Sequence, residues 1–220
     1  MDVQVVASGS KENCYVFNDG KATILLECGL SFQRTLEQLN FKLPDAVLIT
    51  HEHVDHSKSV KGFLKRGVDV YMTAGTAKSL NVNRHNLHIV KPFEEFYVHD
   101  HKFFAVTVKH DAAEPVCYVI DDEILFATDL GEPPDVSGHF KQVWIEANYD
   151  LETLKRALIP PHDKARILEN HLSIVQCKQF LRTIEADEIH LIHISTRHGM
   201  RKKFREAVER ALGSDEVYAH

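Results

Sequence analysis

The sequence predicts an α/β fold of four layers, an α/β/β/α sandwich in which two packed sheets carry helices on their outer faces. Its 220 residues are 44% hydrophobic, which is enough for one domain with a substantial core. Short β-rich runs mix with intermittent helical patterns along the chain. Polar residues follow several of these runs, so loops at one sheet edge are expected to converge on a site.

The chain shows no low-complexity linker, no convincing repeat and no sharp break in composition, so we expect a single domain over residues 1–220. Runs rich in β-formers predict the first strands at 3–6, 14–17, 22–27 and 45–49. Between the last two, Ser31 can cap a helix from Phe32 to Leu39. The motif that begins at His51 then opens another helix.

The second part of the chain continues the mixture of strands and helices. Further strands are predicted at 69–72, 87–90, 93–98, 102–108, 116–120, 123–128 and 142–147. Further helices are predicted near 150–158, 173–184 and 199–211.

Composition narrows the class of protein. The longest apolar runs are far shorter than a membrane span, and no charged region followed by an apolar signal core opens the chain, so we expect a cytoplasmic protein without a membrane partner. The widely spaced Cys14, Cys28, Cys117 and Cys177 predict reduced core residues. The formal net charge of -6 argues against a generally basic nucleic-acid binder, although local cations could still attract phosphate.

The segment from His51 to His56, with the sequence His-Glu-His-Val-Asp-His, offers three imidazoles and a ligating carboxylate directly after an apolar strand-like run. Histidine nitrogen and aspartate oxygen are ligands for borderline divalent cations. In an extended turn, His51 and His53 can point one way while Asp55 and His56 serve a neighbouring position. The motif therefore predicts two adjacent metal ions.

The rest of the ligand set is expected at the ends of later strands. His110, Asp129 and His193 each follow a predicted buried run. A carboxylate such as Asp129 can bridge two cations, and each metal lowers the pKa of bound water toward neutrality. These residues predict a pair of sites that share one carboxylate.

Together these residues resemble the metallo-β-lactamase-fold hydrolase superfamily, whose pattern of HxHxDH followed by His, Asp and His is met here over nearly the whole chain. The resemblance implies one metal held by His51, His53 and His110, a second held by Asp55, His56 and His193, and Asp129 shared between them. The segments Ala7–Cys14, Glu146–Asp150 and Asn170–Ser173 look like those of the YycJ/WalJ-like branch. The expected cofactors are two divalent ions per chain, Zn²⁺ or Mn²⁺.

The chain also departs from that branch. Glu12 stands where its opening usually has Gly, and Glu27 stands where a strand normally ends in Asp. The longer Glu27 carboxylate is expected to alter the support of the metal loop while leaving the candidate ligands intact. Lactamase activity is disfavoured because Asp129 stands where many zinc β-lactamases have Cys.

We assign catalytic roles to Asp55 and His171. His171 lies in a predicted loop before a helix capped by Ser173, and its imidazole could stabilise charge on phosphate or protonate a leaving oxygen without binding metal. Other polar residues rank lower: His99 and His101 are expected to be solvated turn residues, and His190 is expected to face away from His193. For Glu146 and Asn148, a strand-end or helix-start role competes with support of the metal ligands.

For function, the first reading is a metal-dependent phosphodiesterase, a DNA or RNA nuclease of exonuclease-like type, in which a hydroxide bridging two metals attacks phosphorus. Lysines 58, 61 and 65, expected on one helix face, and a second basic cluster could bind phosphate. That cluster comprises Arg197, His198, Arg201, Lys202, Lys203 and Arg205.

Three alternatives stay open: a glyoxalase II-like thioester hydrolase, a cyclic-nucleotide phosphodiesterase and a noncatalytic metal-stabilised module. The expected partner is a nucleic acid or nucleotide substrate. The sequence leaves open whether that substrate is DNA or RNA and whether the enzyme cuts as an exonuclease or an endonuclease. It also leaves open whether the chain forms a homodimer or another oligomer. An intact ligand set argues against the noncatalytic module, because one closed structural site would suffice for folding.

Overall fold

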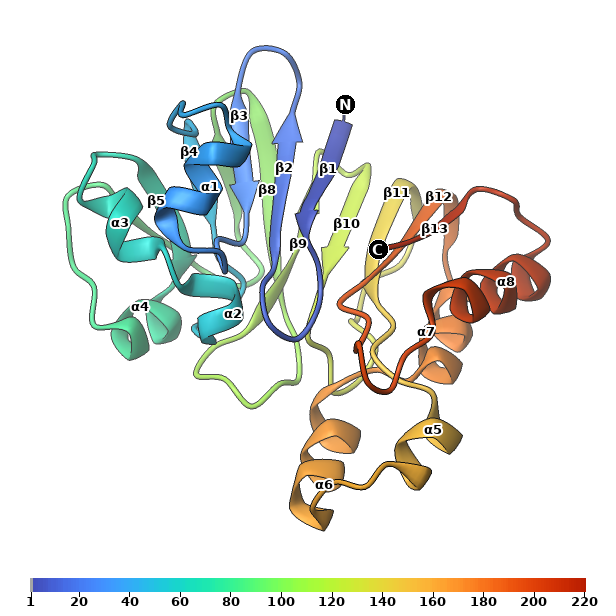
Figure 1. Ribbon diagram of the computed structural model, residues 1–220. Coiled ribbons are helices and arrows are strands. Elements are labelled where there is room, and N and C mark those ends of the chain that lie inside the picture. The colour runs from blue at the N-terminus through green and yellow to red at the C-terminus, as the bar shows by residue number, and fades with distance from the viewer. Residues whose placement is uncertain (1) are drawn as a thin grey trace.

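The computed structural model describes residues 2–220 and has two β-sheets packed face to face with helices outside them (Figure 1). The first sheet has the order β1-β2-β3-β4-β5-β6. Its strands are β1 Asp2–Ala7, β2 Cys14–Asn18, β3 Thr23–Leu26, β4 Ala46–Leu48, β5 Asp69–Thr73 and β6 Leu87–Val90. The strands from β3 to β6 are parallel to one another.

The second sheet has the order β13-β12-β11-β10-β9-β8-β7. Its strands are β7 Glu95–Val98, β8 His101–Thr107, β9 Val116–Ile120, β10 Ile124–Ala127, β11 His139–Glu146, β12 Glu185–Ile192 and β13 Val217–Ala219. The strands from β10 to β13 are parallel, whereas β7, β8, β9 and β10 pair in antiparallel fashion. The carboxyl ends of neighbouring parallel strands therefore lie at one edge of each sheet, where their following loops can meet.

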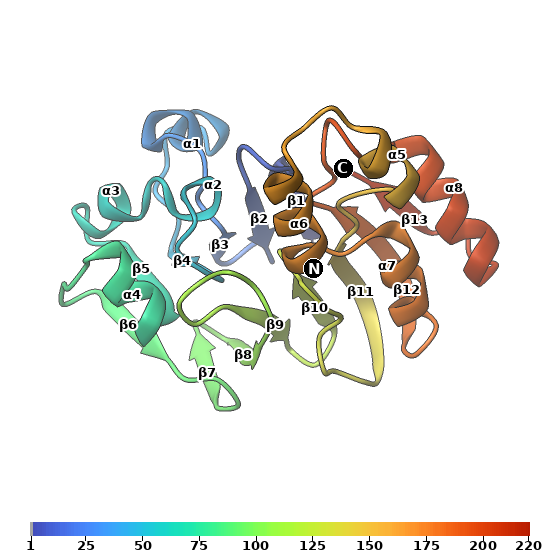
Figure 2. The ribbon, with the colours of Figure 1, turned by 90° about the horizontal axis from the view of Figure 1, so that it is seen from below.

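Helices cover both outer faces. The first group is α1 Phe32–Gln38, α2 Val54–Ser57, α3 Val60–Leu64 and α4 Ala74–Leu80. The second group is α5 Leu151–Arg156, α6 Pro161–Asn170, α7 Ile174–Leu181 and α8 Arg201–Leu212. Figures 1 and 2 show α2 from the first group and α6 from the second at the same end of the molecule. The predicted four-layer sandwich is confirmed.

The layers are held by three apolar clusters. Between the sheets, aromatic side chains dominate, and Tyr15 meets Phe126 edge to face with ring centroids 5.1 Å apart. Outside the first sheet, α3 inserts the fully buried Phe63, and outside the second, α8 inserts Phe204. The alternation of inward and outward side chains along each strand supplies both faces of each sheet with apolar groups.

Several local predictions are corrected. The helix expected after the His51 motif is two short helices, α2 and α3, separated by Lys58 and Ser59. The helix α6 was not predicted, and it begins at Pro161, where a missing N–H costs no intrahelical hydrogen bond. The helix α4 and the strand β13 were also not predicted. In contrast, Ser31 and Ser173 accept hydrogen bonds from the first turns of α1 and α7, as their positions predicted.

Candidate metal centre

The loop from His51 to His56 leaves β4 and enters α2, and neighbouring backbone fixes its course. The carbonyl oxygen of Asp55 accepts a hydrogen bond from the Asn13 amide at 2.8 Å, and that of His56 accepts one from the Cys28 amide at 2.7 Å. Gly29 is required by this packing, because a Cβ atom there would lie 1.6 Å from the carbonyl oxygen of Asp55. The loop is therefore held against the β2 and β3 ends before any ligand binds.

Three acidic or imidazole side chains enter the site from strand ends with unusual backbone conformations. Glu27, Asp129 and His193 follow β3, β10 and β12 and have φ values of 67°, 53° and 50°. Non-glycine residues adopt this left-handed region rarely, and such strain persists where the surrounding structure fixes it. At all three positions the chain turns sharply, and the polar side chain of the turning residue enters the site.

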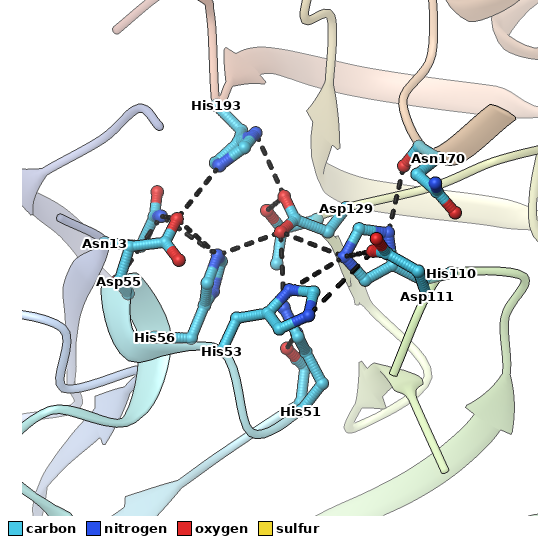
Figure 3. A network of polar contacts seen from close by, with 12 residues as sticks. Asn13, His51, His53, Asp55, His56, His110, Asp111, Asp129, Asn170 and His193 are labelled. Carbon is cyan, nitrogen blue, oxygen red and sulfur yellow. Dashed lines mark hydrogen bonds and ion pairs between the residues drawn. The ribbon is translucent and has the colours of Figure 1, made fainter. Parts of the chain in front are cut away.

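The first group of candidate ligands brings together His51, His53, His110 and Asp129, with one donor atom from each within 4.8 Å of the others (Figure 3). Asp129 Oδ2 lies 3.3 Å from His51 Nε2 and 3.6 Å from His110 Nε2. His53 Nδ1 lies 3.1 Å from His110 Nε2. Three imidazole nitrogens and one carboxylate oxygen match the donor number and type of a tetrahedral zinc site.

Hydrogen bonds at the far side of two rings decide which nitrogen faces the centre. His110 Nδ1 donates to the Asn170 carbonyl oxygen at 3.0 Å, which leaves its Nε2 unprotonated and able to ligate. His51 Nδ1 lies 2.9 Å from Thr50 Oγ1, and its buried Nε2 makes no hydrogen bond. A buried ring nitrogen without a partner, aimed at a carboxylate among other imidazoles, fits a bound cation.

The second group of candidate ligands is Asp55, His56, Asp129 and His193. His56 Nε2 lies 3.0 Å from Asp129 Oδ2 and 3.3 Å from Asp55 Oδ2. His193 Nε2 lies 3.6 Å from Asp55 Oδ2, is buried and makes no hydrogen bond. Burial alone would raise the pKa of Asp129, but the imidazoles of His193 and His56 hold it well below its usual range.

Glu146 has a larger role in the site than its sequence position indicated. Its fully buried carboxylate ends β11, and its Oε1 lies 2.7 Å from His171 Nδ1 and 2.9 Å from His193 Nδ1. Its Oε2 accepts hydrogen bonds from the amides of Leu130 and Leu172 at 2.8 and 3.1 Å. Together with Asp129 and the two histidines it forms a third group of metal-ligating type. Glu146 thus fixes two rings of the site at once.

Other polar groups around the centre were not predicted to support it, or the sequence left their supporting role open. Asn148 Nδ2 donates to the carbonyl oxygen of His193 at 2.9 Å, and Asn13 Nδ2 lies 3.0 Å from His56 Nε2. Glu27 accepts from the Thr50 amide at 3.2 Å and lies 3.7 Å from His56 Nδ1, so the longer side chain still supports the loop. Glu52 accepts from the Ala113 amide at 2.8 Å, which links this loop to the one after His110.

Three histidines that were not predicted as metal ligands have different surroundings. His99 is exposed in a turn, as expected, and His190 stacks on Trp144 with ring centroids 3.7 Å apart, away from His193. The prediction for His101 is wrong, because it begins β8 and is buried, with Nδ1 2.7 Å from Asp121 Oδ2. Its neighbours Asp19 and Asp121 come from hairpin turns that the sequence pattern did not connect to it.

The basic residues divide between different places. The helix is interrupted at Lys58 and Ser59, so the three lysines do not lie on one continuous helix: Lys58 ends α2, Lys61 lies in α3 and Lys65 ends α3. Lys58 lies 3.8 Å from Glu12, which also pairs with Arg34. In the second basic cluster, Arg197 and His198 line a cleft of about 350 Å³ beside His171.

Exposure shows where the centre opens. The side chains of His53 and Asp55 are 26% and 24% exposed, whereas those of His51 and His193 are 1% exposed. The side chain of His171 is 15% exposed and lines the cleft together with Asn148. A substrate can therefore approach from the side of His53, Asp55 and His171, while the opposite side is closed by the sheets.

Comparison with known proteins agrees with this geometry. A family model described as the beta-lactamase superfamily domain matches residues 22–194, a span that contains all seven predicted metal ligands. The chain belongs to the beta-lactamase superfamily. The resemblance inferred from the sequence is thereby confirmed at the level of the family.

Relatives within the superfamily are similar over most of their length. The chain is 30% identical to exodeoxyribonuclease YycJ of Bacillus anthracis, covering 94% of this chain and 88% of that protein. It is also 30% identical to exodeoxyribonuclease WalJ of Streptococcus pneumoniae, covering 90% of this chain and 83% of that one. Among solved structures, the metallo-β-lactamase-fold protein YhfI of Bacillus subtilis superposes with a TM-score of 0.77 at 14% identity, covering 99% and 95% of the two chains.

None of the helices described over residues 2–220 is long and apolar enough to cross a membrane. This agrees with the short apolar runs of the sequence.

Replacement of Glu146 by Gln tests its role as the shared support of His171 and His193. An amide cannot accept from both rings and both backbone amides, so we expect a loss of about 1–3 kcal/mol in the free energy of unfolding. Because His193 would lose its orientation, metal affinity should fall by about 10–100-fold. Thermal unfolding of the metal-free protein and a metal titration measure the two effects.

The matched control is Glu185→Gln, at the exposed start of β12. It should change neither quantity. Unchanged metal affinity in Glu146→Gln would show that His193 is held by its other neighbours.

Proposed function

We propose that this protein is a metal-dependent phosphodiesterase that degrades nucleic acid, DNA in the first place, as an exonuclease. The observation that carries the proposal is the pair of ligand groups joined by the buried carboxylate of Asp129, open to solvent beside a cleft that contains cationic side chains. Relatives named exodeoxyribonucleases at 30% identity over most of both chains support the same choice.

In this proposal His51, His53 and His110 hold one divalent ion, Asp55, His56 and His193 hold a second, and Asp129 contributes to both. The donor set of imidazoles and carboxylates suits Zn²⁺ or Mn²⁺. When bound, the ions supply an activated water as nucleophile and neutralise charge on the phosphate oxygens. The protein's own contribution is to fix the donors, which Thr50, Asn170 and Glu146 do through the far sides of the rings.

The proposal gives His171 the role of acting on the leaving group. Its Nδ1–H donates to Glu146 at 2.7 Å, so its Nε2 is the nitrogen left to meet a substrate. Burial disfavours the charged ring, but the Glu146 carboxylate outweighs it and raises the pKa of His171. A protonated Nε2 can donate to the departing oxygen of the phosphodiester, as a positioned general acid does.

The test of the function is a panel of substrates for the metal-loaded protein: labelled single- and double-stranded DNA, RNA, cyclic nucleotides and a thioester. We expect cleavage of DNA with release of products from an end, identified by their size and terminal groups. Thioester hydrolysis without any phosphodiester cleavage would replace the nuclease by a glyoxalase II-like enzyme. Cleavage confined to cyclic nucleotides would make it a phosphodiesterase of small substrates.

The number of metal ions gives a second prediction. Elemental analysis after reconstitution should find two divalent ions per chain, because both ligand groups are complete and share one carboxylate. Asp129→Ala should lose both the paired binding and most of the turnover. No more than one ion in the wild-type protein, or full activity in Asp129→Ala, would contradict the binuclear centre.

The role of His171 gives a third prediction. His171→Ala should keep two ions but lower turnover on nucleic acid by about a hundredfold or more, the usual scale for losing a positioned acid. A nitrophenyl phosphodiester should be affected less, since its leaving group needs little protonation. Steady-state rates and metal analysis of the same preparations measure both effects.

The control is His99→Ala, an exposed turn residue, which should behave like the wild type. If His171→Ala instead loses an ion, His171 is a ligand of the third group and the assignment of His193 has to be revised.

A further inference from the structure

One hollow adjoins the candidate metal centre, and a second hollow shares a wall with the first. The first is the cleft of about 350 Å³ beside His171, with α6 on one side and residues 195–198 on the other. The second, of about 560 Å³, is lined by residues of α5 and the start of α8. Arg197 and His198 line both, so the two hollows lie side by side at these residues.

Cationic side chains in the hollows are available to a ligand. Within residues 2–220, neither Lys11 nor Arg197 forms an ion pair or a side-chain hydrogen bond, and both are exposed. Arg166 in the same cleft is different, because its Nε lies 2.7 Å from Asp111 Oδ2. In the second hollow, Arg156 and Lys203 add two further cations. Charged groups without protein partners are free to exchange water for phosphate.

The acidic residues of the second hollow are engaged with the protein. Asp150 Oδ1 accepts from the amide and hydroxyl of Thr153 at 3.0 and 2.8 Å. Glu152 Oε1 lies 2.8 Å from Lys155 Nζ. Asp150 also interacts electrostatically with Lys203 and Arg156, so the second hollow is mixed in charge, and Arg197 is the cation of the shared wall.

His198 supplies an independent sign of a ligand. It is only 6% exposed, and its buried Nδ1 has no hydrogen-bond partner among the described residues. Its backbone is fixed, since its amide donates to Ser195 Oγ and its carbonyl oxygen accepts from the Asp150 amide at 2.9 Å. Buried polar atoms in proteins are nearly always hydrogen-bonded, so this unpartnered nitrogen of a residue that lines both hollows is consistent with a polar ligand or a water beside it.

The lining also indicates what part of a nucleic acid would be recognised. The first cleft offers hydroxyls from Ser10, Ser195 and Thr196 besides its cations, and its described lining contains no Phe, Tyr or Trp. The apolar Ile159 and Ile167 and one carboxylate, that of Asp163, which lies 3.3 Å from His162, complete this side of the cleft. Hydroxyls and cations bind phosphate and sugar, whereas bases are usually held by aromatic stacking. A path with this lining reads the backbone and not the base.

We propose that the nucleic-acid strand runs from the candidate metal centre through the first cleft and past Arg197 and His198 into the second hollow. Lys11 and Arg197 hold phosphates next to the one that is cleaved. The path rests on the proposed nuclease function and names the part of the substrate that lies beyond the scissile bond. Because Arg197 and His198 line both hollows, a strand that passes them reaches the second hollow, which a single terminal phosphate would leave empty.

The test compares Arg197→Gln and Lys11→Gln with Arg182→Gln, an exposed control at the end of α7 remote from His171. The metal-loaded enzymes are assayed on labelled oligonucleotides and on bis(4-nitrophenyl) phosphate at several salt concentrations. Each test variant should lower kcat/KM on oligonucleotides about tenfold or more. It should also flatten the slope of log(kcat/KM) against log[salt] by about 0.7–0.9, the value for one lost phosphate contact.

The small substrate and the control variant make the result specific. Cleavage of bis(4-nitrophenyl) phosphate should be unchanged, and Arg182→Gln should match the wild type on both substrates. Equal losses on both substrates would place these cations at the scissile phosphate and overturn the path. So would an unchanged salt slope, or a loss seen only with oligonucleotides that carry a terminal phosphate. Wild-type protein that cleaves no nucleic acid would instead refute the proposed function itself.

Discussion

The carboxylate of Asp129 is 2% exposed and lies within 3.6 Å of ring nitrogens from four histidines, His51, His56, His110 and His193. A buried carboxylate is costly unless cations or hydrogen bonds surround it. The four rings come from both sheets: two follow β4, one follows β8 and one follows β12. Compensation of this one charge therefore requires the two sheets to pack in a fixed position. The left-handed backbone of Asp129 and His193 is the local consequence of that requirement.

A second set of buried polar groups keeps the rings in place. Glu146 and Asn148, at the end of β11, orient His193, and Glu27, after β3, lies behind His56. Glu27 lies on the Nδ1 side of His56, away from Asp129. At His193, Glu146 and Asp129 both lie 2.9 Å from Nδ1, and Nε2 faces Asp55, so Nε2 stays available to a ligand. The centre consequently consists of candidate ligands around Asp129 and of polar groups that hold the ligand rings in place. A change in one of the holding groups acts on the centre through the orientation of an imidazole.

The sequence predicted the candidate ligands around Asp129 better than the polar groups that hold their rings in place. The spacing within His51–His56 is local and chemical, so it indicated a metal site without any tertiary information. The sequence around Glu146 gives no such indication, because a glutamate at the end of an apolar run is equally compatible with a strand end exposed to solvent. Its signal was the unbroken apolar run of Val143, Trp144 and Ile145, which predicts a strand buried on both faces and therefore a buried terminal carboxylate. His101 was misjudged for a similar reason, since its partners Asp19 and Asp121 are distant in the chain.

The distribution of cations bears on how an acidic protein could bind the anionic substrate proposed for it. Many exposed basic residues far from the centre are paired, for example Lys102 with Asp122 and Lys141 with Glu123. Lys11 and Arg197, which line the cleft beside His171, are not paired within the described chain. A net charge of -6 repels polyanions at long range, but Lys11 and Arg197 place positive charge next to the opening. The local field, and not the total charge, then determines where a phosphate backbone can dock.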